Sequence, residues 1–113
     1  MASQINITGR NAMLDNLGTL CVYMALYTDI GGTTEVTGGS YARQSITWAS
    51  ASNGSKSISN TPLFQVPAGV TVRSVGFLTA LTNGTQHAID DVVAETFAGD
   101  GTYTVASATI SLT

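Results

Sequence analysis

Short segments of alternating apolar and polar residues, separated by turns rich in glycine and asparagine, most constrain how this chain can fold. Val70 to Leu78 and Thr102 to Leu112 alternate in this way, and Asn-Gly pairs begin at Asn53 and Asn83. Alternation with a period of two places every second side chain on one face of a strand, and Asn-Gly favours a tight hairpin turn. These signals predict about six to eight short strands. We therefore expect an all-β chain that forms a single β-sandwich, jelly-roll-like domain with one short N-terminal helix.

The helix is expected near the N-terminus. Residues 8–18 read TGRNAMLDNLG, in which Thr8 or Asn11 can cap the first turn, apolar residues follow at helical spacing, and Gly18 can end the helix. We expect residues 1–8 to form an extended arm that is ordered only when something else holds it. Residues 9–113 are then the single β-sandwich domain.

The remaining strands differ in how much of their surface is apolar. Leu20 to Tyr27 is apolar or amphipathic on both faces, as in a central strand, whereas Tyr41 to Ala49 has one apolar face that includes Trp48. The segment between Pro62 and Pro67 is expected at a sheet edge, because proline cannot donate a ladder hydrogen bond.

Two segments are less regular. The alternation slips near Ser74, and a bulge at Gly76 would explain the slip. His87 to Phe97 fits a helix about as well as it fits two short strands, and both alternatives stay open.

Composition excludes several classes of function. Only 10% of the residues are charged, 43% are hydrophobic and the mean hydropathy is +0.22, so the chain is expected to fold. The four basic residues are scattered, which predicts no nucleic-acid partner. The longest apolar run is far shorter than the ~20 residues of a membrane-spanning helix, which predicts no membrane partner. Cys21 is the single cysteine, which excludes an internal disulfide, and no secretory signal is evident.

The sequence offers little catalytic chemistry. Cys21 lies in an apolar strand and is expected to be inert core, and His87 is expected to be an exposed polar residue beside a turn. Phosphate-binding glycine loops, zinc-ligand spacing and nucleophile elbows are absent. We therefore predict a protein that is not an enzyme and that has no cofactor and no metal site.

Two groups of residues are compatible with ligand binding as well as with a simpler structural role. Four carboxylates could gather around a calcium ion, although a solvated acidic edge is favoured: Asp90, Asp91, Glu95 and Asp100. Exposed tyrosines could form a sugar-stacking surface, although Trp48 itself is expected in the core.

A resemblance to a known group of proteins rests on four stretches in order. They are NAMLDNLG at 11–18, VYMALYTDIGG at 22–32, EVTGGSYARQSITWASASNG at 35–54 and PLFQVPAGVTVRSVGFLTA at 62–80. Together they resemble small virion structural proteins of tailed bacteriophages, a group that includes head-decoration, minor tail and tail-fibre-like proteins. The resemblance implies a non-enzymatic virion protein, assembled in the host cytoplasm, that is present in many copies.

Within that resemblance we expect a capsid decoration protein that cements the head lattice as a symmetric oligomer, with a trimer as the first guess. The alternative is a tail-tip or fibre-associated module that binds host surface glycan through tyrosines and the 29–40 loop. Expected partners are the major capsid protein or tail proteins of the same particle. At the corner after Gly38 and Gly39, Arg43 can pair with Glu35 or with another acidic neighbour. The candidate assembly contacts are the arm residues and this corner: Ser3, Gln4, Ile5, Asn6, Ile7, Glu35, Tyr41 and Arg43.

Overall fold

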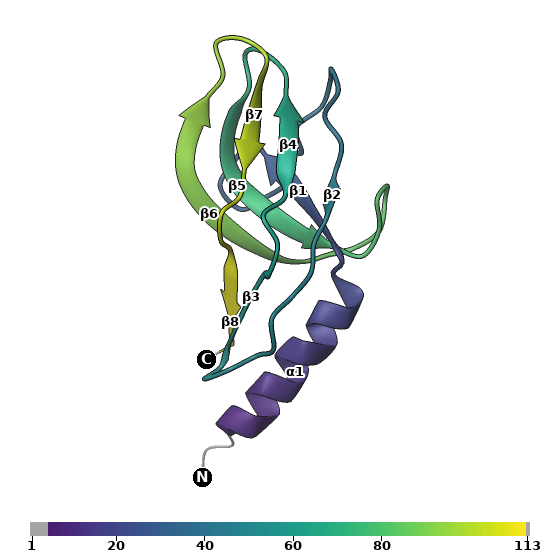
Figure 1. Cartoon of the computed structure of the whole chain (residues 1–113), viewed down its shortest axis with the longest axis vertical. Helices are drawn as coiled ribbons and strands as arrows, with labels where there is room; N and C mark the ends of the chain where they lie inside the picture. The colour runs from purple at the N-terminus through teal and green to yellow at the C-terminus, as the bar shows by residue number, and fades with distance from the viewer. Residues whose placement is uncertain (1–4, 113) are drawn as a thin grey trace.

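The computed structural model describes residues 5–112, which form one helix and eight strands in three small antiparallel sheets (Figure 1). The largest sheet has the order β2-β1-β5-β6, and the two others pair β3 with β8 and β4 with β7. The elements are α1 (Ile7–Leu20), β1 (Tyr23–Tyr27), β2 (Gln44–Ser45), β3 (Ser55–Ser57), β4 (Leu63–Val66), β5 (Thr71–Leu78), β6 (Gln86–Thr96), β7 (Gly101–Thr104) and β8 (Thr109–Ser111). The prediction of a mostly β chain with one short N-terminal helix is therefore confirmed.

Helix α1 begins earlier and ends later than predicted. The side chain of Asn6 caps it by accepting a hydrogen bond from the Gly9 N–H at 2.9 Å. Ile7 and Thr8, which we assigned to the extended arm, are therefore helical, while residues 1–4 of that arm lie outside the described residues. Gly18 does not end the helix. It lies inside the helix at a close approach, where a Cβ would collide with the Lys56 side chain.

The four-stranded sheet contains the centre of the core. Strand β1 pairs with β5 so that Met24 lies opposite Phe77 and Leu26 opposite Val75, all four fully buried. The other face of β1 carries Ala25 and Tyr27, which form a second buried cluster with Leu78. The prediction of a strand that is apolar on both faces and ends at Tyr27 is confirmed, although the strand starts at Tyr23 and not at Leu20.

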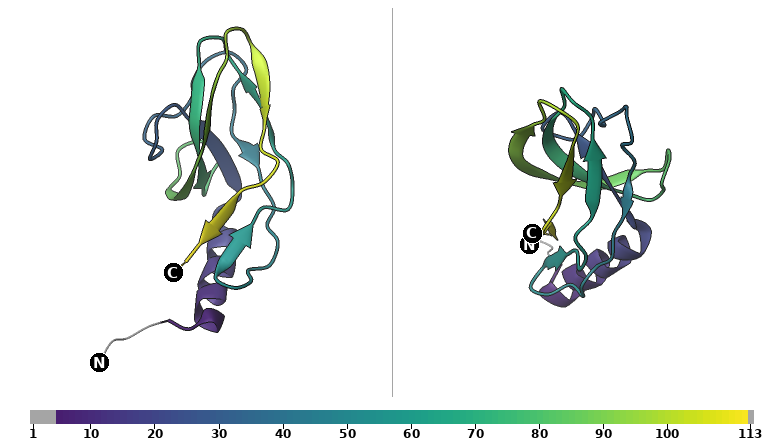
Figure 2. Two further views of the ribbon diagram at one scale, coloured as in Figure 1. Left: turned by 90° about the vertical axis from the view of Figure 1, so that its left-hand side faces the viewer. Right: turned by 45° about the horizontal axis from the view of Figure 1, so that its top comes forward.

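The C-terminal part of the chain is shared between the two two-stranded sheets. The segment from Thr102 to Leu112, predicted as one strand, contains all but the first residue of β7, which pairs with β4, and the whole of β8, which pairs with β3 (Figure 2). Between β7 and β8 the regular alternation of buried and exposed residues is interrupted. Val105 and Ala108 are both buried although they are three positions apart, so they cannot lie on one face of a single regular strand. The sheets are small and not closed, so a single jelly-roll-like sandwich is not confirmed.

Strand β6 resolves the segment that the sequence left open. Residues 86–96 form one 11-residue strand, and neither a helix nor two short strands. It occupies the edge of the four-stranded sheet beside β5, and the pairing shifts between Val72 and Ser74 and again at Leu78. The bulge predicted at Gly76 is therefore wrong. Gly76 pairs regularly with Ile89. A larger residue does not fit at this position, because a Cβ would collide with the Tyr27 ring.

The strand predicted from Tyr41 to Ala49 is much shorter in the structure, because only Gln44–Ser45 pair with β1 as β2 and Trp48 makes an isolated bridge to Ile58. Three other local predictions are confirmed. Strand β4 pairs with one neighbour only, and Trp48 packs against the core, with its ring 5.2 Å from that of Phe77. Asn53 and Gly54 both have positive φ and close the turn that leads into β3.

The molecule is elongated, with extents of 53 × 25 × 24 Å. Helix α1 lies at one end beside the β3–β8 ribbon, and the β4–β7 ribbon lies toward the other end (Figures 1 and 2). In the part of the chain from residue 5 to residue 112, no helix is both long enough and apolar enough to span a membrane.

Candidate functional site: a pocket beside a Glu35–Tyr41–Arg43 network

The predicted pairing of Arg43 with Glu35 is confirmed. The Arg43 guanidinium donates from Nε to Glu35 Oε2 at 3.0 Å and from Nη2 to Oε1 at 2.9 Å. This two-point geometry matches the planar guanidinium to the planar carboxylate. The side chain of Arg43 is 12% exposed and that of Glu35 is 25% exposed, so the pair is largely shielded from water.

Tyr41 completes the network and links it to the sheet. Its hydroxyl donates to Glu35 Oε2 at 2.8 Å and accepts a hydrogen bond from the Leu26 N–H at 3.0 Å. Its ring stacks against Phe64 with the centroids 6.3 Å apart. The segment before β2 is therefore attached both to β1 and to the β4–β7 ribbon.

Arg43 also holds the loop between β5 and β6. Its Nη1 donates to the carbonyl oxygen of Ala80 at 3.0 Å and to that of Asn83 at 2.7 Å. These two acceptors could not be identified from the sequence, because a backbone carbonyl carries no residue-type signal. One arginine thus joins two loops that are about forty residues apart in the chain.

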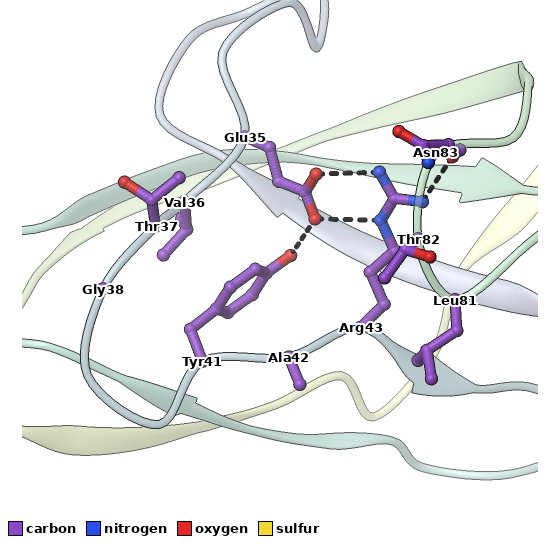
Figure 3. Close-up of a pocket in the computed structure, with 10 residues that line it drawn as sticks. All are labelled: Glu35, Val36, Thr37, Gly38, Tyr41, Ala42, Arg43, Leu81, Thr82 and Asn83. Atoms are coloured by element: carbon purple, nitrogen blue, oxygen red, sulfur yellow. Dashed lines mark hydrogen bonds and ion pairs between the residues drawn. The ribbon is translucent and has the colours of Figure 1, made fainter.

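An open pocket lies where these two loops meet (Figure 3). Its volume is about 580 Å³. Its lining combines the network with small, hydroxyl-bearing and apolar side chains: Glu35, Val36, Thr37, Gly38, Tyr41, Ala42, Arg43, Leu81, Thr82 and Asn83. Because the charged groups in its wall already bind each other, the pocket offers shape and neutral hydrogen-bonding groups more than free charge.

The network shifts the pKa values of all three of its side chains. Burial by itself raises the pKa of the Glu35 carboxyl, but hydrogen bonds from Arg43 and Tyr41 outweigh it and hold this pKa below its usual range. The hydrogen bond to Glu35 raises the pKa of Arg43. Burial and the neighbouring carboxylate raise the pKa of the Tyr41 hydroxyl. Near neutral pH the network therefore contains a carboxylate, a guanidinium and a neutral phenol.

Replacing Tyr41 by phenylalanine is expected to lower the free energy of unfolding by about 1–3 kcal/mol, because the Leu26 N–H loses its acceptor. Urea denaturation measures this change. Tyr103→Phe is the control, because the Tyr103 hydroxyl forms no hydrogen bond with any described residue. Equal losses in both variants would contradict the role given to the Tyr41 hydroxyl.

Stability is expected to fall in acid. Because the pKa of Glu35 is lower in the folded chain than in the unfolded one, the unfolded chain binds more protons and stability rises with pH. This contribution is fully present above the usual glutamate pKa of about 4.3 and is lost as the pH falls through the lowered value. Melting temperatures measured from neutral to acid pH should fall less steeply for Glu35→Gln than for the natural chain. Parallel curves would contradict this assignment.

A second ion pair was not anticipated from the sequence. Lys56, whose side chain is only 6% exposed, donates from Nζ to Asp15 Oδ1 at 2.7 Å and to the Ala49 carbonyl at 2.8 Å. Asp15 also accepts from the Ala51 N–H, and its hydrogen bond to Lys56 lowers its pKa. This pair attaches α1 to β3.

The other candidate residues lie elsewhere. Ile5, Asn6 and Ile7 lie at the start of α1, where the Ile5 carbonyl accepts from Arg10 Nε at 2.8 Å. Ser3 and Gln4 lie outside the described residues. The structure thus brings Glu35, Tyr41 and Arg43 together and places Ile5, Asn6 and Ile7 at a separate end of the molecule.

The residues that could carry chemistry or bind a ligand are dispersed. Cys21 is buried, and burial raises the pKa of its thiol. His87 is exposed on β6. Within residues 5–112, no three acidic, histidine or cysteine side chains gather as metal ligands would. Tyr27 is buried and Tyr41 is held in the network, so these two do not form the sugar-stacking surface considered above.

Comparison with known proteins adds a family to this description. The family model described as podophage GP4 fiber I protein gp80 matches residues 5–113. No curated protein and no solved structure matches the chain. Since the match covers nearly the whole sequence, the chain belongs to the family of the podophage GP4 fiber I protein gp80 and is a phage virion structural protein.

Proposed function

We propose that this chain is a non-enzymatic structural subunit of a fibre on the phage tail, bound to other virion proteins and to further copies of itself. The family match supports this reading over capsid decoration, because the matched family is described as a fibre protein. Capsid decoration as a symmetric oligomer remains the second candidate, and its support is the resemblance of the sequence to small virion proteins.

The observation that carries the proposal is the placement of exposed apolar side chains. Among the described residues, nine large apolar side chains are exposed, and five of them lie between residues 5 and 22: Ile5, Ile7, Met13, Leu20 and Val22. Clustered apolar surface is typical of protein interfaces, whereas isolated exposed apolar residues are ordinary. We therefore place the main assembly contact on α1.

The charges of α1 support this placement. Arg10 and Asp15 are its only charged residues. Asp15 binds Lys56 and Arg10 binds the Ile5 carbonyl, so both are engaged within the chain. The helix surface around Met13, Asn16 and Leu20 is uncharged, and a neighbouring subunit could cover it without burying an unpaired charge.

The location and copy number of the protein in purified virions test the proposal. A tail fibre subunit is expected at the tail in few copies, as seen by immunogold labelling and quantitative mass spectrometry. Labelling spread over the head with copies on the order of hundreds would overturn the fibre proposal and support decoration.

Variants of α1 test the assembly contact. Met13→Glu and Leu20→Glu are expected to lower incorporation into particles while the melting temperature of the free protein changes little, since both side chains are already exposed. Ile30→Glu, at the tip of the loop after β1, is the matched control. Equal incorporation of all three variants would place the contact elsewhere.

Host glycan recognition by the fibre is favoured by one observation, the open pocket beside Arg43. Thr37→Trp, which would fill the pocket, is expected to abolish binding to purified host surface polysaccharide, whereas Ile30→Trp is not. Retained binding by Thr37→Trp, or no binding by the natural chain, would dismiss this candidate.

A further inference from the structure

The two Asn-Gly turns of this chain look alike in sequence but differ in how the glycine N–H is held. Asn53 has a φ of 54° and Asn83 a φ of 57°, both are exposed, and neither side-chain amide is hydrogen-bonded to a described residue. Asn-Gly pairs are prone to deamidation, because the glycine nitrogen can attack the preceding side-chain amide and glycine has no side chain to obstruct it. The attack requires that the glycine nitrogen lose its proton.

At Asn53 the glycine nitrogen that would act as the nucleophile is held in a hydrogen bond. The Gly54 N–H donates to Asn11 Oδ1 of helix α1 at 2.9 Å. The Gly54 carbonyl accepts from the Leu112 N–H, also at 2.9 Å. A proton held in a hydrogen bond is harder to remove, and a glycine fixed at both ends cannot easily turn toward the side chain. This turn is protected by its tertiary contacts.

At Asn83 the corresponding glycine N–H, that of Gly84, donates no hydrogen bond to a described residue. The carbonyl oxygen of the same peptide, that of Asn83, accepts from the Arg43 guanidinium at 2.7 Å. A cation bound to a peptide oxygen withdraws electron density from the peptide and makes its N–H more acidic. Arg43 therefore favours the ionisation that the reaction needs.

We propose that Asn83 is a site of spontaneous, site-selective deamidation, whereas Asn53 is not. The Gly84 nitrogen, having lost its proton to solvent, attacks Cγ of Asn83, and the side-chain nitrogen leaves as ammonia to give a succinimide. Water then opens the ring at either carbonyl, which yields aspartate or isoaspartate. No oxidant or reductant is needed.

The product alters the pocket that Arg43 supports. A carboxylate at position 83 adds one negative charge to a pocket wall formed by Leu81, Thr82 and Asn83. It also offers Arg43 a second acidic partner beside Glu35. In isoaspartate the chain runs through Cβ and Cγ of residue 83, so the backbone gains one atom before Gly84 and the carbonyl that Arg43 binds becomes part of a free carboxylate. The fraction of chains with an acidic residue at position 83 would therefore rise with the age of the particle.

The test is peptide mapping by mass spectrometry of the purified full chain during incubation in mildly alkaline buffer. Aspartate and isoaspartate are expected to accumulate at position 83 several-fold faster than at position 53. Asn83→Asp provides the reference for the acidic product in isoelectric focusing.

Asn11→Ala is the matched variant, because it removes only the acceptor of the Gly54 N–H. It is expected to raise the rate at Asn53 several-fold and to leave the rate at Asn83 unchanged, with circular dichroism confirming that the variant is folded. Equal rates at the two sites in the natural chain, a faster rate at Asn53, or no response of Asn53 to Asn11→Ala would overturn the proposal. If Asn11→Ala does not fold, the comparison of the two sites in the natural chain still decides it.

Discussion

Replacing Arg43 by methionine is expected to lower the free energy of unfolding by about 3 kcal/mol, the lower end of the range for breaking a buried ion pair. The substitution leaves the Glu35 carboxylate, three-quarters buried, without its cation. It also frees the carbonyl groups of Ala80 and Asn83. The lower end of the range applies because Glu35 keeps the Tyr41 hydroxyl and some contact with water.

Urea denaturation of Arg43→Met against Arg73→Met measures this effect. Arg73 is exposed on β5 and forms no ion pair with an acidic side chain in residues 5–112, so its loss should change stability by less than about 0.5 kcal/mol. Combining Arg43→Met with Glu35→Gln should cost less than the sum of the two single changes, because the variants share one interaction. Additive losses would show that Arg43 acts independently of Glu35.

Replacing Phe77 by alanine is expected to cost about 3–5 kcal/mol, the range for removing a buried aromatic side chain. Phe77 is fully buried on β5, opposite Met24, and its ring lies against that of Trp48. The cavity left behind is bordered by strands on both sides, so the surrounding chain cannot readily collapse into it.

Val93→Ala is the control for Phe77→Ala. Val93 is 91% exposed on the edge strand β6, and its truncation should change stability by less than about 0.5 kcal/mol. Chemical denaturation of the two variants should therefore give clearly separated midpoints. A Phe77→Ala midpoint close to that of the natural chain would mean that this part of the core is loosely packed.

Much of the candidate site could be predicted from the sequence because its signals are local. Gly38 and Gly39, both with positive φ, turn the chain before Tyr41, and Arg43 follows Glu35 closely enough to return to it. The pairing was therefore foreseeable. The loop that Arg43 holds was not, because its partners are backbone carbonyls remote in the chain.

The sequence by itself determined the elements whose periodicity and turn chemistry are strong, such as the β1 and β5 strands, the inward side of Trp48 and the Asn53 turn. Tertiary structure decided the features that depend on neighbours. Gly18 lies within α1 because Lys56 packs against it, β6 is one strand because it pairs along β5, and the last segment divides because its halves meet different partners. Local patterns fix which face of a segment is apolar, but the choice of partner depends on contacts between residues far apart in the chain, and those contacts leave no periodic trace in either segment.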